Sequence, residues 1–340
     1  MISNGLYKPI HTGLNALVLK DFNSRLVRQA LKHARKATVK GITETTGLSM
    51  MTVSTILQSL VDSGAALEDD LIPSNGGRPS RLYRFNEIQT LILVIFTREI
   101  KGINTVFIRV ADLYGRILES EDLLLDESSP KVFDPIIDKY LNLYPAIGAL
   151  GFGLPGIEYG GTIIHLDYRS WIGAPIIEHF KNKYNIPVLF ENDVNAAVMG
   201  RGLRKKAPNT EVYIYFPEKY PPGAGIRING QLLKGQRHFA GEVGWLPLGI
   251  PWGDSDFIRS ERDISEAVAK IIVSLTAVLN PESIIIFSEF LTQSHFGKVR
   301  SLCTGQLPEG MVPELIIAEN LTSDFETGII NLTLSLVEQQ

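Results

Sequence analysis

The chain has 340 residues, of which 44% are hydrophobic and 21% are charged, and its formal net charge is −4. This length and composition predict two or three globular domains. No apolar run is long enough to cross a bilayer, and the first residues lack the cationic start and apolar block of a signal peptide, so we expect a cytoplasmic protein with no membrane partner. The single cysteine, Cys303, excludes an intramolecular disulfide and a cysteine-rich zinc site.

Charge is distributed unevenly along the chain. Residues 1–86 contain eleven Lys and Arg against six Asp and Glu, whereas the remainder contains 22 against 31. A basic amino-terminal segment on an acidic body is typical of proteins that bind nucleic acid.

The basic segment carries the pattern of a helix-turn-helix. Apolar residues recur at helical spacing over residues 23–36, and a second, short helix fits residues 39–46. Gly47 ends this helix, and Ser49 is placed to cap a third helix over about residues 50–63. The side chains of this third helix that would face a major groove are Ser49, Met51, Thr52, Ser54, Thr55 and Gln58.

Two short strand patterns, residues 65–73 and 80–86, follow the third helix and predict a β-hairpin, the wing of a winged helix. Gly76 and Gly77 in the connecting loop allow a close approach of the backbone to DNA, and Arg78 suits insertion into a narrow minor groove. The alternative is a surface hairpin on a helical interaction module.

Residues 187–200 predict a strand, a loop and a helix. In an α/β fold, residues just beyond the carboxyl end of a strand face the binding crevice, so Glu191, Asn192 and Asp193 would lie beside a ligand. Asp193 is the best candidate for a functional carboxylate. The alternative is that Asn192 or Asp193 only caps the helix that begins near Val194.

The order of these parts, with TGLSMMTVSTILQSLVDSG followed by GGRPSRLYRFN, resembles the winged-helix head of repressors in the ROK family. That family groups sugar-responsive repressors with sugar kinases that share an actin-like ATPase body. The resemblance implies an α/β protein with a winged helix-turn-helix domain over residues 1–86 and a two-lobed, ribonuclease H-like ROK body over residues 87–340. The lobes would cover about residues 87–203 and 204–320, followed by a C-terminal helix over residues 323–338.

The resemblance also implies a ligand site. In the kinases an aspartate takes the proton from the sugar hydroxyl and the preceding asparagine binds ring hydroxyls; these match Asp193 and Asn192. Glu242 matches a glutamate that accepts hydrogen bonds from the sugar, and Gly156 lies in the turn that matches the sugar-side loop. Trp245 replaces a histidine that binds sugar and zinc, so its indole either stacks on the sugar or, as we prefer, fills the space of the missing zinc loop. Gly156, Asn192, Asp193, Glu242 and Trp245 are therefore the expected effector-binding residues.

Three features of the kinases are missing. Residues 97–101 lack the glycines of the ATP phosphate loop, and Glu99 would repel phosphate. The cysteine-rich zinc motif is absent, and residues 288–290 replace the glycine-rich turn on the adenosine side. We therefore expect no catalytic residue, no metal and no cofactor.

These features together predict a DNA-binding transcriptional regulator, a repressor of carbohydrate metabolism genes. It would bind a double-stranded DNA operator as a homodimer or a dimer of dimers, and sense a sugar or sugar derivative through a body that is not an enzyme. Two alternatives remain: a sugar kinase with an attached DNA-binding head, and a regulator whose body is only a dimerisation scaffold.

Overall fold

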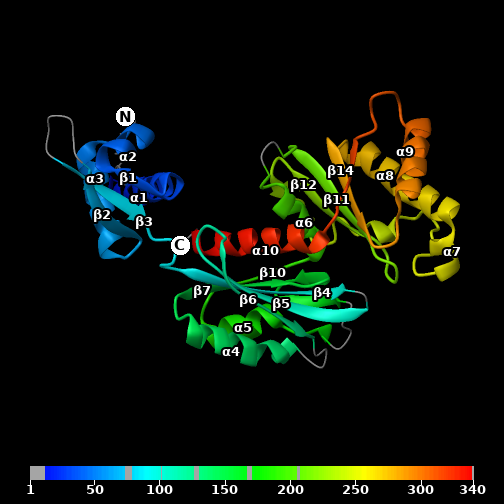
Figure 1. Ribbon diagram of the computed structural model, residues 1–340, viewed down its shortest axis with the longest axis horizontal. Coiled ribbons are helices and arrows are strands. Elements are labelled where there is room, and N and C mark those ends of the chain that lie inside the picture. The colour runs from blue at the N-terminus through cyan, green and yellow to red at the C-terminus, as the bar shows by residue number, and fades with distance from the viewer. Residues whose placement is uncertain are drawn as a thin grey trace, which may run out of the picture. The chain divides into compact units, whose positions relative to one another are not determined.

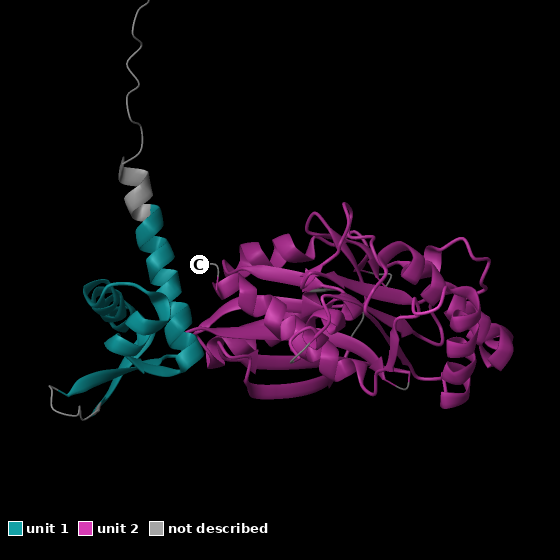
Figure 2. Cartoon of the chain, turned by 90° about the horizontal axis from the view of Figure 1, so that it is seen from above, with its two compact units in different colours: residues 1–89 teal, residues 90–340 magenta. Residues whose placement is uncertain are grey.

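The computed structural model describes residues 12–72, 79–100, 102–125, 130–166, 171–204 and 207–338. Contacts divide the chain into two compact units, Met1–Gln89 and Thr90–Gln340, which are coloured separately in Figure 2. No helix in these described ranges is long and apolar enough to cross a membrane.

The first unit combines three helices with a small antiparallel sheet. The helices are α1 (Thr12–Ala34), α2 (Val39–Thr46) and α3 (Met50–Asp62), and the strands β1 (Lys36–Thr38), β2 (Ala66–Ile72) and β3 (Ser80–Phe85) pair in the order β1-β3-β2. Gly47 ends α2 in the left-handed conformation, with φ of 72°, a region that glycine enters without steric cost. The Ser49 side chain accepts a hydrogen bond from the Thr52 N–H at 3.1 Å and so caps α3.

Periodicity predicted these helices with differing accuracy. The predicted bounds of α2 are confirmed, and α3 ends one residue before the predicted end. The first helix begins at Thr12 rather than at Asn23, and Ala34, which belongs to the apolar pattern of residues 23–36, is exposed. Strand β1 was not predicted.

The second unit contains two lobes, each built on a five-stranded sheet (Figure 1). The first sheet has the order β10-β7-β4-β5-β6, with β4, β7 and β10 parallel. Its strands are β4 (Leu91–Ile100), β5 (Ile103–Ala111), β6 (Ile117–Leu124), β7 (Ile147–Gly153) and β10 (Val188–Glu191). Helices α4 (Asp134–Leu143) and α5 (Ile176–Tyr184) cover one face, and β8 (Gly156–Tyr159) and β9 (Thr162–Leu166) form a separate hairpin.

The second sheet has the order β13-β12-β11-β14-β15, with β11, β14 and β15 parallel. Its strands are β11 (Thr210–Phe216), β12 (Gly223–Ile228), β13 (Gln231–Leu232), β14 (Ser283–Ser288) and β15 (Glu314–Ile317). Helices α8 (Glu261–Leu279) and α9 (Gln293–Gln306) pack on it, and the short α7 (Ser255–Arg259) precedes α8. Helices α7 and α9 were not predicted.

Two helices lie between the sheets and contact each other closely. Helix α6 (Asp193–Arg201) packs on β11 and β12, and α10 (Leu321–Glu338) packs on β4, β7 and β10. A Cβ atom at Gly328 would lie 1.7 Å from the carbonyl oxygen of Ala196, and one at Gly200 would lie 2.1 Å from that of Asp324. The two helices therefore meet backbone to backbone, at a distance that only glycine permits.

The start of α10 differs from the prediction. The helix begins at Leu321 rather than at Ser323, and the Asn320 side chain accepts a hydrogen bond from the Ser323 N–H at 3.3 Å. Glu326, in the first turns of this helix, forms an ion pair with Arg109 at 2.5 Å. That pair attaches α10 to the first sheet.

Candidate functional site

Asn192 begins the helix that carries the candidate carboxylate. Its side-chain oxygen accepts hydrogen bonds from the N–H groups of Val194 at 3.0 Å and Asn195 at 3.4 Å, so the capping alternative holds for this residue. Its amide nitrogen donates to the carbonyl oxygen of Gly156 at 3.3 Å. The loop after β7 and the start of α6 are thereby fixed to each other.

Asp193 is the first residue of α6 and is half-buried. One carboxylate oxygen accepts a hydrogen bond from the Val194 N–H at 2.9 Å; the other has no hydrogen-bond donor among the described residues. Burial raises the pKa of Asp193, although the Val194 N–H and the Arg98 charge act in the opposite direction. The Asp193 oxygen that has no donor is free to accept a hydrogen bond from a ligand.

Glu242 supplies a second carboxylate, from the other lobe. Its loop is fixed to the start of β12, because Ala224 donates a backbone hydrogen bond to Gly241 at 2.8 Å and Gly244 donates one to Pro222 at 3.0 Å. A Cβ at Gly241 would lie 1.8 Å from the Ala224 oxygen, so this approach requires glycine. Burial, with a contribution from the Asp193 charge, raises the pKa of Glu242 to about 6.

Two half-buried carboxylates, Asp193 and Glu242, restrict what this site can bind, and the charge of the first raises the pKa of the second. Across the ranges the structure describes, the Glu242 carboxylate has no hydrogen-bond or ion-pair partner, and no group of three or more His, Cys, Asp or Glu residues could hold a metal ion. Carboxylates accept hydrogen bonds from hydroxyl groups without needing a cation. The pair therefore suits a neutral, hydroxyl-rich ligand.

Trp245 and Gly156 have different environments. The Trp245 side chain is 71% exposed, with the Phe239 ring 6.3 Å away. The expectation that it fills space left by a missing loop is therefore wrong, because the indole lies at the surface. Gly156 is buried, and a Cβ there would lie 2.4 Å from the His165 oxygen, so this residue positions Asn192 through its carbonyl group.

Several polar contacts in this part of the body were not predicted from the sequence, although Glu191 itself was expected beside a ligand. Buried Glu191 accepts a hydrogen bond from the Asn195 side chain at 3.0 Å, and Lys234 of the second lobe lies 2.6 Å from its other oxygen. His238, from the same lobe as Lys234, lies 2.6 Å from the Glu158 carbonyl oxygen. Glu191 and Asn195 are four residues apart, whereas the Glu191–Lys234 and Glu158–His238 contacts join segments far apart in the sequence, so no local pattern links them.

The segment that matches the first phosphate loop is not a loop in this protein. Strand β4 runs to Ile100 and pairs with β5 as far as Ile103, so the chain reverses in a tight hairpin at Gly102, whose φ is 80°. Arg98 and Glu99 form ion pairs with Glu289 and Lys219 of the second lobe.

The residues predicted to contact DNA lie along α3. Ser49, Met51, Ser54, Thr55 and Gln58 are exposed, whereas Thr52 is half-buried and lies 2.8 Å from the Ser49 hydroxyl. Met51 is 82% exposed, which is unusual for a large apolar side chain. Gly77 and Arg78 lie outside the described residues.

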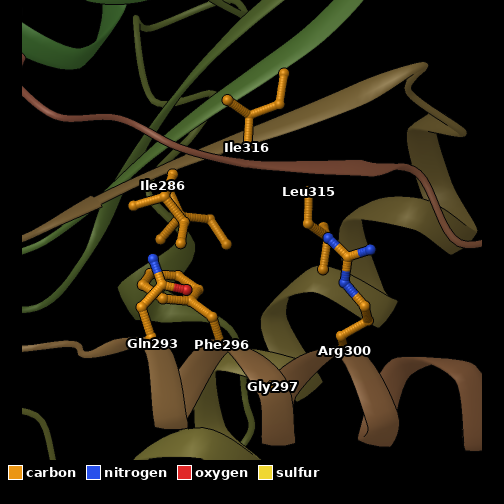
Figure 3. Close-up of a pocket in the computed structure, with 8 residues that line it drawn as sticks. Ile286, Gln293, Phe296, Gly297, Arg300, Leu315 and Ile316 are labelled. Atoms are coloured by element: carbon orange, nitrogen blue, oxygen red, sulfur yellow. The ribbon is translucent and has the colours of Figure 1, made fainter.

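Figure 3 shows a separate groove between α9 and the edge of the second sheet. It has a volume of about 200 Å³ and is lined by Ile286, Gln293, Phe296, Gly297, Arg300, Leu315, Ile316 and Ile317. None of these residues belongs to the candidate effector site.

Comparisons with known proteins agree with this architecture. The model of the ROK family matches residues 102–261. The xylose repressor of Caldicellulosiruptor bescii is 27% identical over 278 residues, which cover 76% of this chain and 68% of that protein. A putative fructokinase of Bacillus subtilis is 31% identical over 121 residues, but these cover only 33% of this chain and 40% of that protein.

Among solved structures, a ROK family transcriptional regulator, a homolog of the E. coli MLC protein, shares the fold with a TM-score of 0.66. The match covers 94% of this chain and 98% of that one at 16% identity. The fold is therefore that of a ROK family transcriptional regulator, residues 102–261 match the ROK family model, and most of the chain is similar in sequence to a xylose repressor.

Proposed function

We propose that the protein is a transcriptional repressor that binds operator DNA through a winged helix in residues 1–86 and senses a sugar or sugar derivative through its ROK body, residues 87–340, without catalysing phosphoryl transfer. The observation that carries this proposal is the share of the chain over which each relative is similar to it. The named repressor matches over 76% of the chain, whereas the fructokinase matches over 33%.

The geometry of the first unit supports DNA binding. A buried stripe of Val53, Leu57 and Leu60 fixes α3 to the small core, which leaves an uncharged polar face of hydroxyl and amide groups beside Met51. Such a face reads base edges by hydrogen bonds and apolar contact in a major groove. The excess of Lys and Arg over Asp and Glu in residues 1–86 attracts the phosphate groups of DNA.

Asp193 and Glu242 support the effector part of the proposal. They come from different lobes, and the Glu242 carboxylate has no partner within the described part of the chain. Trp245, exposed three residues beyond Glu242, offers an aromatic face on which a sugar ring can stack. The similarity to a xylose repressor makes D-xylose the first sugar to test.

The side of the body that would bind nucleotide lacks the features of a phosphate-binding site. Backbone N–H groups in a glycine-rich loop bind phosphate, whereas residues 97–100 are paired as a strand and carry Glu99. Glu289 stands where the adenosine-side turn is expected and accepts hydrogen bonds from Arg98 and Tyr215. A coupled assay of ATP consumption over pentoses, hexoses and N-acetylhexosamines should show no turnover; sugar-dependent turnover would favour the kinase alternative.

DNA recognition by α3 is tested with two exposed glutamines. Gln58 lies on the proposed recognition face, whereas Gln29 lies on α1. With an operator selected from random duplex DNA, Gln58→Ala should lower the affinity measured by fluorescence anisotropy about 5- to 150-fold, because one lost base contact costs about 1–3 kcal/mol. Gln29→Ala should bind like the parent. Equal affinities for all three proteins would remove α3 from the interface.

A further inference from the structure

Two ion pairs connect the lobes where β4 of the first sheet approaches the second. Arg98, near the end of β4, lies 2.9 Å from the Glu289 carboxylate, just beyond β14. Glu99, the next residue, lies 2.6 Å from Lys219, which follows β11. Adjacent side chains of one strand therefore pair with opposite charges on two segments of the other lobe.

Arg98 is held by more than its ion pair. Its side chain is only 13% exposed, it donates a hydrogen bond to the Thr322 hydroxyl at the start of α10, and its guanidinium lies 5.0 Å from the centre of the Phe287 ring. Tyr215 donates a hydrogen bond to the same Glu289 oxygen at 3.1 Å. A charge so enclosed is costly to leave unpaired, so the Arg98–Glu289 pair resists separation.

The same groups lie within electrostatic reach of the candidate effector site. The Arg98 charge lowers the pKa of Asp193, and the Glu289 charge raises it. Asp193 follows β10 of the first lobe but begins α6, which packs on β12, and the Glu242 loop is fixed to the same strand. Gly156 of the first lobe accepts the hydrogen bond of the Asn192 amide, so a movement of one lobe against the other would change how Asn192 is held beside these carboxylates. An effector site made from both lobes binds more tightly when its geometry is fixed in advance.

We propose that Arg98–Glu289 and Glu99–Lys219 form an inter-lobe latch, which holds the lobes in the arrangement in which Gly156 positions Asn192 beside Asp193 and Glu242. Arg98 is then a positioning residue for the effector site. The positioning role of Arg98 rests on the proposed function, whereas the latch itself does not. In this protein, side chains join the lobes in the region that matches, by resemblance, the nucleotide-binding region of the ROK kinases.

The latch is tested by the distance between the lobes in the full chain without ligand. Leu124 on β6 and Val278 on α8 are 78% and 81% exposed, so cysteines at these two positions can carry spin labels, while Cys303 is buried. The latch variant is Glu289→Gln with Lys219→Gln, which removes the more exposed partner of each pair. The matched control is Arg262→Gln, which breaks an exposed pair with Glu266 inside one helix.

Pulsed electron-paramagnetic-resonance distance measurements should give one narrow distribution for the parent and the Arg262→Gln control. The latch variant should give a broader distribution, with its mean shifted by several ångströms, while its circular dichroism stays that of the parent. Lys219→Gln alone leaves the enclosed Arg98 pair intact and should give a smaller change in the distance distribution. This single variant keeps the test possible if the double variant has a folding defect. A latch-variant distribution identical to that of the parent overturns the proposal.

Sugar titrations separate this result from the proposed function. If D-xylose binds the parent, its affinity for the latch variant should fall at least about tenfold, the loss expected when a preorganised site must be reformed. If no sugar of the panel binds the parent, the proposed effector function fails while the distance measurement still decides the latch.

Discussion

Glu242 is the residue whose charge responds most directly to pH in the candidate site. Its pKa of about 6 in the folded protein lies above its ordinary value of 4.5, so folding favours the protonated form. The stabilisation that comes from the protonated form is complete below pH 4.5 and is lost as the pH rises through about 6. At neutral pH the buried charge therefore lowers the free energy of unfolding.

Glu242→Gln should therefore stabilise the protein at pH 7.5 by up to about 2 kcal/mol, the free energy that corresponds to the shift in pKa. The gain should shrink towards zero at pH 5, where the parent carboxyl is largely protonated. Urea unfolding at the two pH values measures it. Glu309→Gln, at an exposed position, is the control and should show no such pH dependence. A gain independent of pH would mean that removal of the Glu242 charge is not its cause.

At the scale of elements, the contact between α6 and α10 determines how the lobes are joined. Gly200 and Gly328 bring the two helices together at backbone distance, and Phe325 of α10 packs its ring 4.9 Å from that of Phe96 on β4. Since Asp193 begins α6, this carboxylate of the candidate site is held by a helix that packs closely on α10, whereas Glu242 lies in a loop.

Gly328→Ala should destabilise the protein by about 1–3 kcal/mol or more, because its Cβ would overlap the Ala196 carbonyl group and backbone must shift. The matched control is Gly297→Ala in α9, where a Cβ would meet no atom within 4 Å. That substitution should instead stabilise the helix by up to about 1 kcal/mol. Equal effects of the two substitutions, measured by urea unfolding, would contradict the close helix contact.

The elements also show what the sequence could and could not predict. Helix α3 has a clear apolar stripe and was predicted. Helix α9 contains Gly297 and Gly305 and buries only Val299 and Cys303, so its periodicity is weak. Strand β1 has three residues and exists because β3 pairs with it.

Part of the candidate site could also be predicted from the sequence. Asn192 and Asp193 follow a strand directly, and their position alone marks them. The Arg98–Glu289 and Glu191–Lys234 pairs join segments far apart in the chain, and only the folded arrangement reveals them.

At the scale of the whole molecule, recognition of an operator requires more than one chain. A single α3 reads too few base pairs for specificity, and a two-fold dimer presents two recognition helices to half-sites about one helical turn apart or a multiple of it. We therefore expect the selected operator to be an inverted repeat that binds two chains at saturation. Sedimentation of the complex measures this stoichiometry, and a single chain per operator would contradict it.

In the proposed function the body controls DNA binding through Asp193, so operator affinity should be measured with and without sugar. For the parent, D-xylose or another sugar of the panel should change the affinity by about 5- to 150-fold, the usual range of coupling between sites. Asp193→Ala should bind the operator like the parent and show no response to that sugar. The account is contradicted if the variant responds like the parent, or if it loses DNA binding while its fold is preserved.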